Sequence, residues 1–177
     1  MKADTNTKKN HAKYESYALA FRMIDDALQH GCPLQAIAVE ESILTDRLSS
    51  TLNAGRVKAS PKTSLGKALA EWKPKSAKSS PNANAVLSDG EMEKLYPSLR
   101  QWWDDRCALL HAIVKSSQCE APSLSPDAFV ALANKTAKTG LALSRKVDNW
   151  TRRRIRATKS AAKTKKFDDT ITKGERQ

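Results

Sequence analysis

Two residues in the second half of the chain have types and spacing that could do chemistry. Arg106 and His111 are separated by four residues in the segment WWDDRCALLHAIV, residues 102–114, where His111 is the one histidine of a strongly apolar stretch. Arginine is a permanent cation whose forked N–H donors can grip a phosphate. Histidine takes or gives a proton near neutral pH. Together they are a minimal set for cutting a phosphodiester without a metal ion.

The spacing also constrains how the pair could act. On an α-helix the two side chains diverge by about 140° around the axis and by about 7.5 Å along it. One helix therefore cannot direct both at a single phosphate. Two copies that meet across a two-fold axis could place both pairs in one shared cleft. A catalytic role for Arg106 and His111 thus predicts a homodimer.

The arrangement resembles the HEPN superfamily, small helical bundles found in bacterial defence and toxin–antitoxin ribonucleases. Their mark is an Arg followed a few residues later by a His, on the helix before the last, and Arg106 and His111 match it. The resemblance covers residues 11–157, and residues 36–48 look like the acidic second helix of such bundles. One departure is Cys107, which stands where the family usually has a polar residue, often Asn.

The resemblance implies a metal-independent endoribonuclease in which a 2′-hydroxyl attacks the neighbouring phosphate. His111 would be the general acid or base, and Arg106 would stabilise the charge developing on the phosphate. RNA is required because DNA lacks that hydroxyl. The resemblance further implies a toxin or antiviral effector, with a neutralising antitoxin or a defence protein as a possible partner, and no cofactor.

Acidic residues provide candidates for supporting this pair, namely Glu40, Glu41 and Asp46, with Asp105 and Cys107 on either side of Arg106. We expect Glu40 or Glu41 to orient the Arg–His pair. The alternative is a solvated face with pairs four residues apart. A metal-dependent nuclease using Glu40, Glu41, Asp104 and Asp105 is a weaker interpretation, because no spacing specifies it.

The net charge of +12 is concentrated in two segments. Residues 56–80 carry a net +6 and residues 145–177 a net +8, while the rest is nearly neutral. Basic segments on a neutral body suggest a polyanionic partner, RNA or DNA. Lys and Arg without interleaved aromatic residues contact phosphates rather than bases, and the candidates are Lys146, Arg152, Arg153, Arg154 and Arg156. The alternative interpretation of the basic segments is a solubilising tail. The alternative function for the whole chain is a non-catalytic nucleic-acid-binding or adaptor module.

Composition restricts the protein class. No apolar run is long enough to cross a membrane, and the first ten residues are polar, so no signal peptide is expected. The three cysteines, Cys32, Cys107 and Cys119, form no CxxC pair. They argue against a disulfide scaffold or a cysteine-rich zinc site and favour a reducing cytoplasm.

The elements that must position these residues are predicted to be helices, because apolar residues recur at helical spacing and Ala, Leu, Lys and Glu dominate. We expect helices over residues 11–29, 33–54, 64–72 and 88–96, and then a helix to about residue 117 that Pro97 opens or kinks. The last helix is expected to begin at residue 125, to continue past residue 156 and to fray among residues 159–166. The prediction is an all-α up-and-down bundle of four long helices and one or two short ones. Residues 1–10 form a polar tail, 56–86 a basic loop with a short helix, and 158–177 a basic C-terminal tail.

Overall fold

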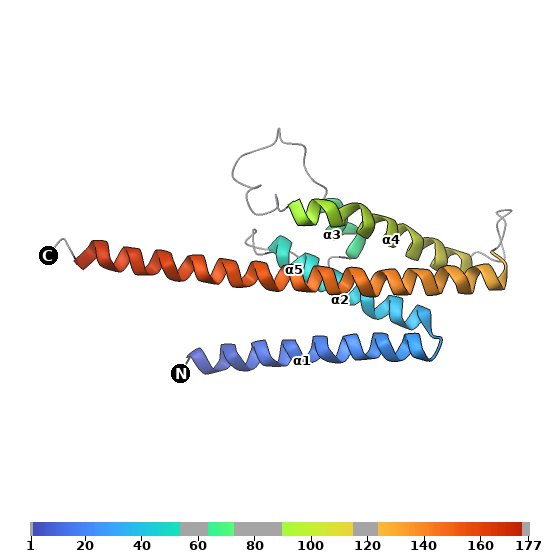
Figure 1. Cartoon of the computed structure of the whole chain (residues 1–177), viewed down its shortest axis with the longest axis horizontal. Coiled ribbons are helices and arrows are strands. Elements are labelled where there is room, and N and C mark those ends of the chain that lie inside the picture. The colour runs from blue at the N-terminus through green and yellow to red at the C-terminus, as the bar shows by residue number, and fades with distance from the viewer. Residues whose placement is uncertain (1, 54–63, 73–89, 115–123, 175–177) are drawn as a thin grey trace, which may run out of the picture.

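Helices make up the described part of the chain (Figure 1), and it contains no strand. The computed structural model describes the backbone of residues 2–53, 64–72, 90–114 and 124–174, and the side chains of 11–51, 64–71, 90–112 and 124–157. The helices are α1 (Lys2–Gln29), α2 (Pro33–Asn53), α3 (Leu65–Trp72), α4 (Gly90–Val114) and α5 (Pro126–Gly174). Four are long and one is short, which confirms the predicted all-α bundle.

The α1–α2 hairpin is determined locally. Gly31 has a φ of 68°, which glycine adopts without steric cost. The amide of Cys32 donates to the carbonyl of Ala27 at 2.8 Å, and that of Gly31 to Leu28 at 3.3 Å. These are the two bonds of a Schellman ending. Pro33 opens α2, where its missing N–H costs nothing, so the chain reverses over three residues as predicted.

Helix α2 lies at the centre of the bundle. It packs against α1, α3 and α5, and α5 also packs against α4. Its Leu44 and Leu48 are buried in a core that includes Trp102 of α4 and Trp150 of α5. Residues on α2 can therefore reach residues on most of the other helices.

Helix α4 differs from the prediction. The sequence predicts a short helix over residues 88–96 and a longer one to about residue 117 that Pro97 opens or kinks. Instead, one helix runs through Pro97 from Gly90 to Val114. A proline inside a helix costs about 3 kcal/mol. Met92 before it and Leu99 after it lie seven residues apart on one buried face, and burial of that continuous face offsets the cost. The expected helix start at residue 88 lies outside the described residues.

The first and last helices are longer than predicted. Helix α1 begins at Lys2 rather than near residue 11, and α5 continues to Gly174 rather than fraying among residues 159–166. Neither extension contains a proline, and α5 has no glycine between 158 and its last residue. Extending an established helix is much easier than starting one. Both extensions project from the same end of the bundle (Figure 1).

Other boundaries are set by hydrogen bonds. The Ser64 hydroxyl accepts from the amide of Lys67 at 3.4 Å at the start of α3. The Ser125 hydroxyl accepts from the amide of Ala128 at 3.2 Å at the start of α5, followed by Pro126 in the first turn as predicted. The predicted basic loop, residues 56–63 and 73–86, lies outside the described residues. Among the described residues, no helix combines the length and apolarity needed to cross a bilayer.

Candidate functional site

Helix α4 places Arg106 and His111 on different sides of its surface. Trp102 and Leu109 define the side that faces the core. Arg106 lies within about 60° of both of these positions, whereas His111 lies about 160° from Leu109. Accordingly, the Arg106 side chain is 22% exposed, and His111 is an exposed residue near the end of the helix. The two side chains diverge within one chain, as their spacing predicted.

Arg106 is held by an acid from the second helix. Its Nη2 donates to Oε2 of Glu41 at 2.5 Å, and the two side chains are 22% and 23% exposed. Its guanidinium carbon lies 4.9 Å from the centroid of the Trp103 ring. That ring in turn packs on α3, since a Cβ built on Gly66 would lie 3.0 Å from Trp103 Cζ2. The guanidinium is therefore fixed by a carboxylate and by an aromatic platform.

Glu40, the neighbour of Glu41, turns into the core instead. It is fully buried, and neither carboxylate oxygen has a hydrogen-bond partner among the described residues. A Cβ added to Gly140 of α5 would overlap this carboxylate and lie 2.6 Å from Trp102 Nε1. Burial raises the pKa of Glu40 to about 8. Glu40 thus makes no polar contact with Arg106, and the expectation of an orienting acid fits Glu41 rather than Glu40.

Asp46 faces α1 rather than the Arg–His pair. It accepts a hydrogen bond from the Tyr17 hydroxyl and pairs with Lys13 Nζ at 3.0 Å. Burial works to raise the pKa of Asp46, but the hydrogen bonds from Tyr17 and Lys13 outweigh it and hold this pKa below its usual value. Burial and the bond to Asp46 raise the pKa of the Tyr17 phenol. Asp46 therefore fastens α2 to α1 and does not contact Arg106.

The two remaining supporting candidates flank Arg106 on α4. Asp105 accepts a hydrogen bond from Gln101 Nε2 at 2.8 Å, one turn earlier. Cys107 is a half-buried free thiol. No described contact joins either side chain to Arg106 or His111.

The basic residues of α5 are less uniform than their sequence suggests. Arg152 Nε pairs with Asp148 at 2.9 Å, Arg153 pairs with Glu91 of α4 at 2.6 Å, and Arg154 lies 5.4 Å over the Trp150 ring. Lys146 and Arg156 are exposed. Part of the predicted phosphate-contacting set therefore also links helices of the bundle.

Sequence reasoning missed a buried ion pair at the centre of the fold. Arg47 of α2 pairs with Asp148 of α5, and these side chains are 8% and 6% exposed. The Arg47 guanidinium also lies 3.8 Å over the Tyr17 ring. The spacing of Asp148 and Arg152, four residues apart on one helix, indicates their local pair but gives no signal for a partner on α2.

Among the side chains that the structure describes, no three His, Cys, Asp or Glu residues gather in a way that could hold a metal ion. Asp104, named in the metal-dependent interpretation, pairs instead with Arg100 at 3.3 Å. In comparisons with known proteins, no family model, curated protein or solved structure matches this chain.

Proposed function

We propose that this chain is a metal-independent endoribonuclease of the HEPN type. The observation that carries the proposal is the fixed guanidinium of Arg106, held by Glu41 and Trp103 five residues before the exposed His111. A cation that is already oriented stabilises charge on a reacting phosphate without reorganising. An exposed imidazole is accessible to substrate and to water.

In the proposed reaction the 2′-oxygen of a ribose forms a bond to the adjacent phosphorus, and the bond from phosphorus to the 5′-oxygen breaks. The proton of the 2′-hydroxyl goes to a base, and the leaving 5′-oxygen receives a proton from an acid. The products are a 2′,3′-cyclic phosphate and a 5′-hydroxyl end. His111 performs proton transfer, and Arg106 binds the phosphate oxygens.

The reaction needs both an acid and a base, but each chain offers one His111 here. Two copies related by a two-fold axis would bring two imidazoles to one cleft, one neutral and one protonated. The divergence of Arg106 and His111 on α4 supports the same arrangement. A homodimer with its α4 helices facing each other is therefore part of the proposal.

The biological setting follows from the resemblance to the superfamily. The enzyme would be a toxin or antiviral effector in a reducing cytoplasm, controlled by an antitoxin or another defence protein. The competing proposal is a non-catalytic helical nucleic-acid-binding or adaptor module. The ion pair between Arg106 and Glu41 favours that alternative, because a phosphate must share Arg106 with the carboxylate or displace it.

The test is cleavage of transfer RNA and mixed RNA by the purified protein, with and without EDTA. We expect cleavage in both conditions, cyclic phosphate ends, and no cleavage by a His111→Ala variant with unchanged helicity and melting temperature. Arg106→Lys should also be inactive, because lysine keeps the charge but loses the fork. His11→Ala, at an exposed histidine on α1, is the matched control and should cut normally.

Two outcomes would count against the proposal. If the His111→Ala variant cuts RNA at the wild-type rate, His111 is not catalytic. If no wild-type preparation cuts RNA but RNA still binds, the adaptor function is favoured. Light scattering should show a dimer at working concentration, and an active strict monomer would exclude the shared cleft.

A further inference from the structure

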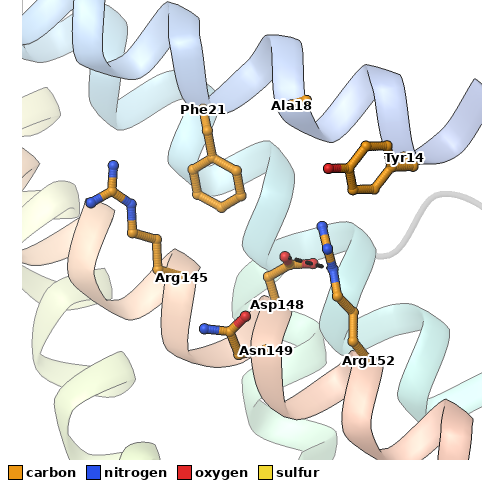
Figure 2. A pocket seen from close by; sticks show the side chains of 7 residues that line it. All are labelled: Tyr14, Ala18, Phe21, Arg145, Asp148, Asn149 and Arg152. Carbon is orange, nitrogen blue, oxygen red and sulfur yellow. Dashed lines mark ion pairs between the residues drawn. The ribbon is translucent and has the colours of Figure 1, made fainter.

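A groove of about 340 Å³ lies between α1 and α5, away from Arg106. Figure 2 shows it bordered by Tyr14, Ala18 and Phe21 of α1 and by Arg145, Asp148, Asn149 and Arg152 of α5. Its volume falls in the range of about 300–1,000 Å³ that is usual for small-ligand sites. One wall is thus mostly aromatic, and the other is polar with two cations.

On the aromatic wall Tyr14 is open to solvent, whereas Phe21 is partly buried and packs against the core. Tyr14 is 58% exposed, and the guanidinium carbon of Arg152 lies 5.4 Å from the centroid of its ring. The Phe21 ring points into the groove in Figure 2. Exposed aromatic faces beside cations are the combination on which single-stranded nucleic acids stack their bases.

The opposite wall is positively charged. Asp148 is 6% exposed and is shared between Arg47 and Arg152, so its negative charge is neutralised from two sides. Arg152 uses Nε for that contact, and Arg145 uses Nη2 to reach Asp25 at 3.2 Å. A guanidinium has five N–H donors. Both arginines therefore keep donors for a phosphate.

We propose that this groove binds one nucleotide of a single-stranded RNA. The base stacks on the exposed ring of Tyr14, and the phosphates contact Arg145 and Arg152. The exposed amide of Asn149 lies where it can hydrogen-bond a base edge. This inference rests on the proposed function only in taking RNA as the partner.

The groove and Arg106 are far enough apart that they would contact different nucleotides of one RNA strand. Glu41 contacts Arg106 and Arg47 contacts Asp148, and these two α2 residues are six positions apart. That spacing places them about 120° apart around α2 and about 9 Å apart along it. The groove therefore contributes affinity and positioning, and cleavage takes place elsewhere.

The experiment measures binding of fluorescein-labelled single-stranded oligoadenylate and oligouridylate by anisotropy. The full chain carries His111→Ala in every sample, so that the probe is not cut. Tyr14→Ala removes the stacking surface and Tyr14→Phe retains it. Arg145→Gln removes a groove cation. Arg100→Gln is its matched control, because Arg100 is 50% exposed and paired with one carboxylate, much as Arg145 is 54% exposed.

We expect Tyr14→Ala to weaken binding by about fivefold or more, the lower end of the stacking effects measured for single bases. Tyr14→Phe should bind like the parent chain. Arg145→Gln should reduce the slope of log affinity against log salt by about 0.7, as for one lost phosphate contact on a single strand, and by more than Arg100→Gln does. A 4-thiouridine probe should cross-link to the α1 peptide that contains Tyr14.

Equal affinity of Tyr14→Ala and the parent chain, or cross-links confined to other helices, would overturn the groove proposal even if the wild-type enzyme cuts RNA. Conversely, loss of affinity in Tyr14→Ala with no cleavage by any wild-type preparation would retain the groove and reject the nuclease. The two proposals therefore fail independently.

Discussion

Replacing Glu40 by glutamine should remove most of the pH dependence of stability between pH 5 and 8. Glu40 is fully buried, and its carboxylate oxygens have no hydrogen-bond partner among the described residues. Desolvation penalises the charged form, which raises the pKa of Glu40 from 4.5 to about 8. Glutamine has nearly the same shape and never ionises.

The sign and size of this pH dependence of stability follow from proton linkage. The folded chain keeps the Glu40 proton over a pH range in which the unfolded chain has released it. The stabilisation is thus complete below pH 4.5, falls as the pH rises, and is lost above about pH 8. The slope is about 1.4 kcal/mol per pH unit, or about 5 kcal/mol over the whole interval as an order of magnitude.

Urea unfolding followed by circular dichroism at several pH values between 5 and 9 measures the effect. Taking the difference between wild type and Glu40→Gln cancels other titrating groups, including Asp46. We expect the variant to gain several kcal/mol relative to wild type between pH 5 and 8. Parallel stability profiles for the two proteins would refute the reasoning, because they would show that Glu40 titrates normally and has access to water.

Three further changes test the packing and the charges. Gly140→Ala should destabilise the fold by about 1–3 kcal/mol, because the new Cβ meets the Glu40 carboxylate and the buried indole of Trp102. Gly90→Ala is the control and should be neutral or slightly stabilising, because the space around Gly90 is open. Thermal melts compare the two variants. Arg47→Met should lower the free energy of unfolding, measured in urea, by about 3 kcal/mol, because Asp148 stays buried with only Arg152 as a partner. An unchanged urea midpoint would contradict a structural role for this ion pair. Changing the four arginines between 152 and 156 to glutamine should weaken RNA binding and flatten its salt dependence without changing turnover at saturating RNA. Normal binding at all salt concentrations would identify that segment as a solubility device or a protein contact.

Features that depend on neighbouring residues could be predicted from the sequence. The turn at Gly31, the serine cap before Pro126 and the helical periodicity of the long segments involve groups a few residues apart. The all-α class and the divergence of Arg106 and His111 follow from the same local geometry. The prediction of a helix boundary at Pro97 was wrong, because it was based on the proline alone. Burial of residues on both sides of Pro97 stabilises a continuous helix.

The sequence could not say which acid reaches Arg106. Glu40 and Glu41 are adjacent and chemically alike, and they differ only by about 100° of rotation on α2. The packing of α2 directs Glu41 to α4 and Glu40 into the core beside Gly140. Likewise, the pairing of Arg47 with Asp148 joins residues about 100 positions apart in the chain. Local chemistry therefore determined the helices and the candidate pair, whereas tertiary packing alone decided the partners of each charged side chain, because those contacts depend on how helices are rotated against one another.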